Sequence, residues 1–359
     1  MDKTIVEALL RIKFSNVNNF VLNVNNIKKI DKNDTSIYIA IELNFAVKSE
    51  MHEIQMLIEQ EIFSVTSLVT KVSISINIKS HKVQQGLIPL KTVKNIIAIA
   101  SGKGGVGKSS TTVNLALALS KEGAKVGILD ADIYGPSQPK MLGIMEQKLK
   151  TERGKTLNPI MSRGLQVMSI GFLVDSMTPI IWRGPMVTGA LEKLLKDTNW
   201  NNLDYLLVDL PPGTGDVQLT LAQKIPVTGA IIVTTPQDIA LLDAQKGLKM
   251  FEKVNIPIIG IVENMATHIC SKCGNEENIF GKDGGLKISK EHNVDLLGRL
   301  PLDIDIRKDL DEGIPSVIRN INGKIAKDYK EIAIKTSLKI ASLNEDCTNK
   351  FPNIIIDKN

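Results

Sequence analysis

Seven short apolar runs, each followed by a turn and a segment with helical spacing, dominate the chain from Asn95 onward. Strands that are apolar on both faces are typical of a parallel sheet that helices cover on both sides. The pattern therefore predicts an α/β unit with a doubly wound parallel sheet, whose ligands bind outside the carboxyl ends of the strands. The runs are NIIAIA, KVGILD, LQVMSI, YLLVDLPP, GAIIVTTP, IPIIGIVEN and VDLLGRLP.

The first 85 residues follow a different pattern and predict a small α+β unit. Alternating apolar and polar residues indicate strands with one wet face, and two further segments have helical spacing. A single core stops growing at roughly 250 to 300 residues, so a chain of 359 residues is expected to form two units. The expected order is α-β-β-α-β, with an amphipathic start at Ile5, Leu9 and Ile12, strands at 20–30, 35–47 and 69–80, and a helix at 51–63.

These patterns divide the chain into four parts. We expect the small unit at 1–85, a linker at 86–94, the sheet-based unit at 95–345 and a tail at 346–359.

The segment 323–343 closes the larger unit with apolar residues at helical spacing and lysines between them. This spacing favours a helix that packs on the sheet, and the alternative is a helix that lies on a membrane surface.

Composition limits the class of protein. The apolar runs are much shorter than the ~20 residues of a membrane span, and the N-terminus lacks the features of a secretory signal. Three cysteines are too few for a disulfide framework. The net charge of +5 is spread along the chain without a long basic block. We therefore expect a cytoplasmic protein that binds neither a membrane nor nucleic acid.

The segment SGKGGVGKSS satisfies the G-x-x-x-x-G-K-[ST] pattern between the first apolar run and a helical segment. Glycines let successive backbone N–H groups face phosphate oxygens, Lys108 neutralises them, and the Ser109 hydroxyl can ligate Mg²⁺. The pattern predicts an ATP site, and the alternative is a glycine-rich turn without a ligand. The expected phosphate-binding residues are Gly102, Lys103, Gly104, Gly105, Val106, Gly107, Lys108, Ser109 and Ser110.

Lys103 adds a second lysine to this loop, directly after its first glycine. Within one subunit Lys108 already serves the phosphates, so Lys103 could instead reach a nucleotide held by a facing subunit, as an arginine finger does. This interpretation implies a homodimer. The alternative is a solvated surface lysine.

Polar residues at the ends of three further runs complete the expected nucleotide site. Asp130 and Asp132 close the second run, and Asp209 closes the fourth. We assign Asp209 to the water shell of Mg²⁺ and Asp132 to the attacking water, with helix capping or turn chemistry as the alternative. Asn264 follows the sixth run and could bind the purine edge, or it could form an Asx turn.

Cys270 and Cys273 form a C-x-x-C pair after the sixth run. Two thiolates can share a metal centre, but a tetrahedral zinc or an iron–sulfur cluster needs four ligands. A second copy of the cysteine pair, related by a two-fold axis, is the simplest source of the two missing ligands. A [4Fe-4S] cluster that bridges the two copies would fit this arrangement. Zinc, thiol redox chemistry and inert thiols are the alternatives. His268 is expected to be incidental, and Cys347 to be an ordinary thiol.

Several motifs together resemble the Mrp-type iron–sulfur carrier ATPases, within the MinD and ParA group of deviant P-loop proteins, from about 95 to 316. The motifs are GKGGVGKSS, DADIYGPSQPKMLG, RGPM, DYLLVDLPPGTGD, TTPQDIALLDAQKG, ENM and the C-x-x-C pair. The resemblance implies a P-loop NTPase fold and a homodimer that binds and slowly hydrolyses ATP. It also implies a labile [4Fe-4S] cluster on Cys270 and Cys273 for transfer to apo-proteins, and a Lys103 that acts across the dimer.

Two departures from the family pattern are modest: Ser110 replaces the usual threonine, and SKC replaces a proline-containing spacing between the cysteines. Three other functions are alternatives to a cluster carrier. A positioning ATPase of the MinD or ParA kind does not require the cysteines, and an electron donor like the nitrogenase iron protein carries its ligands on two separated segments. A zinc-binding dimeric ATPase would use the same two cysteines.

Overall fold

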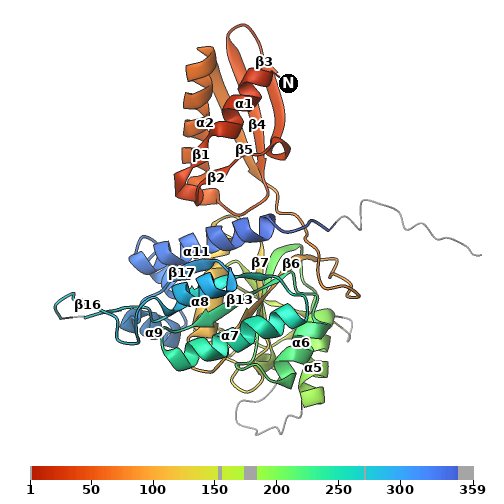
Figure 1. Cartoon of the computed structure of the whole chain (residues 1–359). Coiled ribbons are helices and arrows are strands. Elements are labelled where there is room, and N and C mark those ends of the chain that lie inside the picture. Colours follow the sequence, from red (N-terminus) through yellow and green to blue (C-terminus); the bar gives the residue numbers. More distant parts are fainter. Residues whose placement is uncertain (1, 153–155, 174–183, 271, 347–359) are drawn as a thin grey trace, which may run out of the picture.

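The computed structural model describes residues 2–152, 156–173, 184–270 and 272–346. A small N-terminal unit stands on a larger unit built around one sheet (Figure 1). None of the helices in these described ranges is both long and apolar enough to span a bilayer.

An eight-stranded sheet forms the centre of the larger unit, in the order β10-β11-β7-β12-β6-β13-β14-β17. All seven apolar runs are strands of this sheet, and all seven are parallel to their neighbours among these runs. The predicted parallel sheet is therefore confirmed. The strands are β6 (Val93–Ala100), β7 (Val126–Asp130), β11 (Leu165–Ser169), β12 (Leu203–Asp209), β13 (Gly229–Thr234), β14 (Ile258–Glu263) and β17 (Leu296–Arg299).

The eighth strand is β10 (Ile160–Ser162), which pairs antiparallel with β11 at one edge of the sheet. The sequence did not predict this strand, because three residues are too short to stand out as an apolar run. It leads directly into β11 through Arg163 and Gly164, which both have positive φ and form the turn of a hairpin.

Helices cover both faces of the sheet and make two separate cores. One core contains side chains of α3 (Lys108–Lys121) and α11 (Lys324–Ala341), and the other contains side chains of α5 (Gly184–Asp197), α6 (Asp216–Lys224), α7 (Asp238–Lys253) and α8 (Gly284–His292). This is the doubly wound arrangement that the apolar strands predict. The shorter helices are α4 (Gln138–Met141), α9 (Ile304–Asp311) and α10 (Ser316–Arg319).

The N-terminal unit has a three-stranded sheet in the order β3-β4-β5, with β4 antiparallel to β3 and parallel to β5. Alternate residues of β4, from Ile37 to Leu43, are buried against the helices. The unit is thus the small α+β unit expected before the larger one. Its elements are α1 (Lys3–Arg11), β1 (Lys13–Phe14), β2 (Phe20–Val21), β3 (Ile27–Lys32), β4 (Ser36–Leu43), α2 (Met51–Thr66) and β5 (Val69–Ile76).

The single strand predicted at 20–30 is wrong. Asn23 accepts a hydrogen bond from Asn25 N at 2.9 Å and starts a 3₁₀ helix at Val24–Asn26, which separates β2 from β3. Asparagine side chains bond readily to nearby backbone groups, so this Asn-rich stretch turns where apolar alternation alone indicates a strand.

Helix α11 joins the two units. Its residue Ser337 accepts a hydrogen bond from the backbone N–H of Ala46 at 2.6 Å and lies 2.8 Å from the hydroxyl of Tyr205 on β12. Ile334 packs in the core of the small unit, whereas Ile332 packs in the core of the larger one. The prediction that this segment is a closing helix packed on the sheet is therefore confirmed.

Candidate functional site

The glycine-rich loop lies between β6 and α3, at the carboxyl edge of the sheet. Two of its glycines allow close approach of other parts of the chain. A Cβ on Gly102 would lie 2.3 Å from the backbone carbon of Asp243, and one on Gly107 would lie 2.1 Å from Asn264 Nδ2. Gly107 also has φ +84°, which favours glycine. The loop therefore depends on its glycines for packing as well as for conformation.

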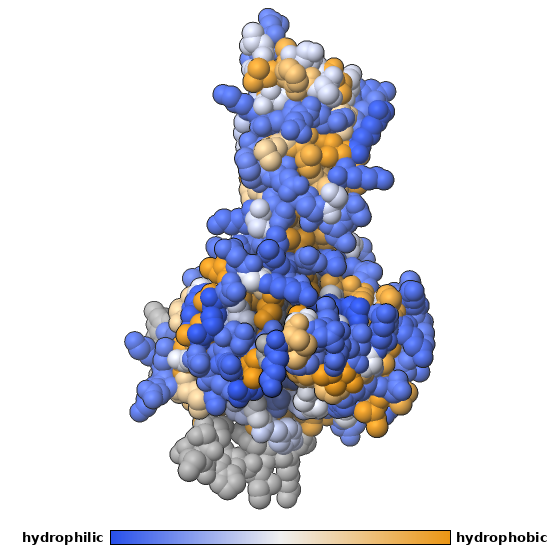
Figure 2. Space-filling model, turned by 90° about the vertical axis from the view of Figure 1, so that its left-hand side faces the viewer, coloured by the Kyte–Doolittle hydropathy of each residue, from blue (hydrophilic) through white to orange (hydrophobic). Residues whose placement is uncertain are grey.

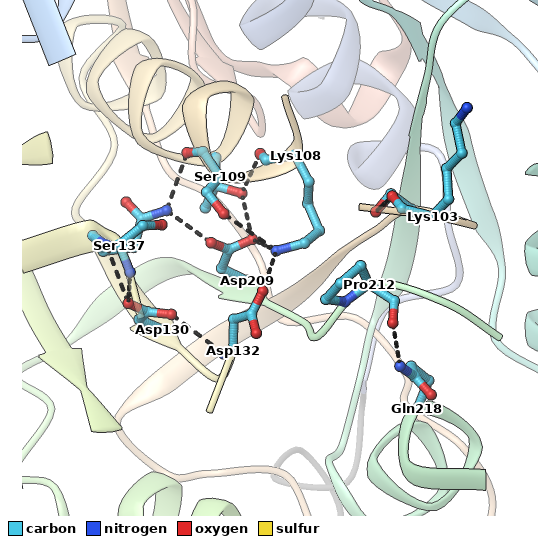
Figure 3. A network of polar contacts seen from close by, with 12 residues as sticks. Lys103, Lys108, Ser109, Asp130, Asp132, Ser137, Asp209, Pro212 and Gln218 are labelled. Atoms are coloured by element: carbon cyan, nitrogen blue, oxygen red, sulfur yellow. Dashed lines mark hydrogen bonds and ion pairs between the residues drawn. The ribbon is translucent and has the colours of Figure 1, made fainter. Parts of the chain in front are cut away.

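Lys108 and Asp209 form a buried ion pair in this site. Lys108 Nζ lies 2.5 Å from Asp209 Oδ1, and the two side chains are 5% and 0% exposed. Asp132 Oδ2 lies 3.7 Å from the same Nζ (Figure 3). Burying one of these charges alone would be costly, so each depends on its partner. The structure thus brings together Lys108, Asp132 and Asp209, as the sequence predicts.

Asp130 and Gln138 form a second layer behind this ion pair. Asp130 Oδ2 accepts hydrogen bonds from Ser137 N, Gln138 N and Ser169 Oγ at 3.0 to 3.1 Å. Gln138 Nε2 donates to Asp209 Oδ2 at 2.9 Å and to the carbonyl of Ser109 at 3.0 Å. Complete burial, together with the charge of Asp209, raises the pKa of Asp130 to about 7.

Sequence reasoning missed this second layer. The strand pattern places Asp130 at the end of a strand but assigns it no role. Gln138 could not be recognised from its neighbours in the sequence, because its partners lie 29 and 71 positions away. The one indication available was the place of Gln138 shortly after the acidic end of a strand that borders the site.

The Ser109 hydroxyl and the Asp209 carboxylate could hold Mg²⁺. Lys108 Nζ lies 3.3 Å from Ser109 Oγ and 2.5 Å from Asp209 Oδ1, so a cation already sits between the hydroxyl and the carboxylate expected to bind the metal. Hydroxyl and carboxylate oxygens are suitable ligands for this hard cation. The donor set therefore fits Mg²⁺, and Ser109 and Asp209 are the residues that would hold it.

Lys103 lies apart from this cluster. Its carbonyl accepts a hydrogen bond from Ser101 Oγ at 2.9 Å, while its side chain points away from Lys108 and Asp209 (Figure 3). The nearby loop after β12 is held by Gln218, whose Nε2 donates to the carbonyl of Pro212 at 2.6 Å. The Lys103 side chain is therefore not part of the Lys108 cluster of its own chain.

Asn264 follows β14 and contacts the loop directly. Its Nδ2 donates to the carbonyl of Val106 at 2.9 Å, and the side chain is 8% exposed. In this arrangement Asn264 supports the loop backbone, so a contact with the purine remains a prediction. Of the other loop residues, Gly104 and Gly105 are exposed, whereas Ser110 lies in the first turn of α3, where its carbonyl accepts a hydrogen bond from Asn114 Nδ2 at 2.9 Å.

Cys270 and Cys273 lie in a small hairpin formed by β15 (His268–Ile269) and β16 (Glu276–Glu277), which projects from the larger unit (Figure 1). Both thiols are free, and Cys273 is exposed. The backbone N–H groups of Cys273 and then Lys272 lower the pKa of the Cys270 thiol, which favours the thiolate that binds metals.

No group of three or more His, Cys, Asp and Glu side chains with a metal-binding arrangement occurs in the described parts of the chain. His268 Nδ1 instead lies 3.2 Å from the carbonyl of Leu302. One chain thus offers two cysteine ligands at this hairpin. Cys347 and residues 347–359 of the expected tail lie outside the described residues.

Comparison with known proteins agrees with these features. A family model described as "ParA: NUBPL iron-transfer P-loop NTPase" matches residues 92–337. A protein of Pseudomonas fragi named iron-sulfur cluster carrier protein is 58% identical over 265 residues, covering 74% of this chain and 92% of that protein. One of the same name from Haemophilus influenzae is 49% identical over 318 residues, covering 88% and 86%.

Among solved structures, the nucleotide-binding protein in complex with ADP from Archaeoglobus fulgidus is 36% identical, with a TM-score of 0.58. The match covers 67% of this chain and 92% of that one. The match to the Haemophilus influenzae protein also extends into the N-terminal unit, because its share of this chain exceeds what the larger unit alone contains. The resemblance inferred from the motifs is confirmed: the chain belongs to the family of NUBPL-type iron-transfer P-loop NTPases.

Proposed function

We propose that this chain is an ATP-hydrolysing carrier that holds a [4Fe-4S] cluster between two copies of itself and delivers it to apo-proteins. The observation that carries the proposal is the projecting hairpin with two free thiols, one of them exposed. Two ligands per chain require a second copy to complete a four-ligand site. The names of the relatives from Pseudomonas fragi and Haemophilus influenzae support a cluster as the cargo.

ATP is the proposed nucleotide. The buried ion pair of Lys108 and Asp209 suggests how the chain would bind its phosphates. Lys108 would leave Asp209 to bind the β- and γ-phosphate oxygens, while the N–H groups from Gly102 to Ser110 cradle them. Mg²⁺ would neutralise developing charge on the phosphates, held by Ser109 and by Asp209 through water. Asp132 would orient the attacking water. The Archaeoglobus fulgidus protein was solved in complex with ADP, which supports a nucleotide at this site.

The exchange of partners by Lys108 would also couple the nucleotide to the cargo. Asp209 ends β12, and Asn264 follows β14 and contacts the loop, six residues before Cys270. A shift of the loop on nucleotide binding would therefore reach the hairpin through a short segment. Lys103 would complete the site of the facing copy, so that nucleotide and cluster both depend on the dimer.

The proposed setting follows the same reasoning. The carrier would act in the cytoplasm on apo iron–sulfur proteins, without binding nucleic acid or a membrane. ATP hydrolysis would be slow. It would determine when the cluster is loaded or released.

Anaerobic reconstitution with iron and sulfide tests the proposal. We expect wild type to bind iron and sulfide, show visible absorbance and activate an apo-acceptor, and Cys270→Ala and Cys273→Ala each to lose all three. Cys347→Ala is the matched control and should behave as wild type. A cluster retained by both hairpin variants would overturn the proposal, as would tightly bound zinc that iron cannot replace.

A further inference from the structure

A cavity of about 470 Å³ lies where the small unit meets the larger one. Its wall comes from the 3₁₀ helix Lys48–Glu50 of the small unit, the end of α3, α10 and the residues after it, and α11. In Figure 2 the molecule narrows between its two units, and the surface there is mostly hydrophilic. Small-molecule sites occur preferentially at such boundaries between units, and the volume is in the range of a metabolite site.

Four lysines from three elements line this cavity. Lys48 belongs to the small unit, Lys121 ends α3, and Lys327 and Lys330 lie on α11. Two carboxylates offset part of this charge. Glu50 pairs with Lys330 at 2.7 Å, and Glu122 accepts a hydrogen bond from Ser49 N at 2.9 Å. The cavity therefore keeps an excess of positive charge, and bringing like charges together opposes folding unless an anion neutralises them.

Lys121 is the cation most in need of such a partner. Its Nζ donates to the carbonyl of Val317 at 2.5 Å, and none of the ion pairs in the described part of the chain includes it. Loss of water on burial lowers the pKa of this ammonium group. Val317, which is buried, and Ile321, which is 63% exposed, add apolar surface beside it.

We propose that this cavity binds an organic anion that carries two or more carboxylate or phosphate groups. The lysines would bind the charged groups, and the apolar wall around Val317 and Ile321 would contact the carbon skeleton. Charge-assisted hydrogen bonds from several ammonium groups give such an anion an advantage over a singly charged one.

Helix α3 connects the cavity to the nucleotide site. Helix α3 runs from Lys108 in the phosphate-binding loop to Lys121 at the cavity, and its 14 residues make a rod about 20 Å long. The small unit docks on the same helix end, where the N–H of Lys48 donates to the carbonyl of Glu122 at 3.1 Å. An anion in the cavity would thus hold the small unit and the phosphate-binding helix together.

Titration calorimetry on the full chain tests this proposal. The protein is first saturated with ADP, so that added anions cannot occupy the phosphate-binding loop. Tricarballylate, with three carboxylates, is titrated in one arm and inorganic pyrophosphate in the other, and the tighter binder identifies which chemistry the cavity prefers. We expect saturable binding of one anion per chain and a higher unfolding temperature when it is bound.

Variants separate the cavity from general attraction of anions to a basic protein. Lys121→Gln with Lys327→Gln should weaken binding by about tenfold or more, and Lys327→Gln alone, on an exposed side chain, should weaken it by a smaller factor. Lys253→Gln with Lys282→Gln removes the same charge from exposed positions elsewhere and should leave binding unchanged. Absence of saturable binding in both arms, or equal loss in the control pair, would overturn the proposal.

Discussion

Lys108 and Asp209 bind each other across the nucleotide site, with Nζ and Oδ1 2.5 Å apart and both side chains buried. Asp209 also accepts a hydrogen bond from Gln138 Nε2 at 2.9 Å and one from Thr112 Oγ1 at 3.3 Å. The carboxylate is thus held from three sides, while the lysine lies on a flexible stem. We therefore expect Lys108, and not Asp209, to move when a nucleotide binds.

Lys108→Met should destabilise the nucleotide-free protein as well as abolish ATP binding. The variant leaves a fully buried carboxylate without its cation, which costs about 3 to 5 kcal/mol in comparable buried pairs. Urea unfolding measures the stability, and titration with ATP measures binding. The double variant Lys108→Met with Asp209→Asn should recover much of the stability without recovering binding. A single variant as stable as wild type would contradict a stabilising pair.

Asp130 should make the nucleotide-free protein less stable as the pH rises. Burial and Asp209 raise its pKa from 3.8 to about 7, so between these values the folded protein retains a proton that the unfolded chain releases. The stability linked to this group falls through that window, by up to about 1.4 kcal/mol per pH unit. Unfolding free energies across the window should decline less steeply in Asp130→Asn, whereas the exposed Asp34→Asn should follow wild type.

Lys103→Ala should retain ATP binding and lose most of its turnover. The side chain points away from the Lys108 cluster of its own chain, and we propose that it completes the site of the facing copy (Figure 3). Loss of one such cation in trans typically costs a factor of about 10³ or more in turnover. ATP affinity and kcat, measured separately, give the comparison. Unchanged kcat would rule out a role for this lysine across the dimer.

Ser337→Ala should loosen the connection between the two units. Its hydroxyl accepts from the N–H of Ala46 and contacts the hydroxyl of Tyr205, and the variant leaves two buried polar groups unsatisfied. The expected cost is about 1 to 3 kcal/mol in the free energy of unfolding. Ser342→Ala, which removes an exposed hydroxyl from the end of the same helix, should have little effect. Equal stability of both variants would mean that the buried contact is not needed.

The architecture of the larger unit was predictable because its strands are buried on both faces and therefore read as unbroken apolar runs. Where a strand is short, as β10 is at Ile160–Ser162, or where asparagines turn the chain, as at Val24–Asn26, periodicity failed. The packing of α11 was predictable from its spacing, but its hydrogen bond to Ala46 joins residues 291 positions apart.

The sequence predicts the part of the candidate site that forms where parallel strands end. Lys108, Asp132 and Asp209 meet because the carboxyl ends of neighbouring parallel strands share one edge. The bond from Asn264 to Val106 and the support of Asp209 by Gln138 were not predictable, since each requires the relative placement of distant segments. Both contacts depend on how the whole of the larger unit folds.

If two copies of the hairpin share one cluster, as we propose, the iron-to-chain ratio of the reconstituted protein reveals it. Iron and sulfide analysis, combined with light scattering under anaerobic conditions, should give four iron atoms per two chains in a dimer, because each chain supplies only Cys270 and Cys273. A monomer that holds its iron with both cysteines would rule out a cluster shared between two chains.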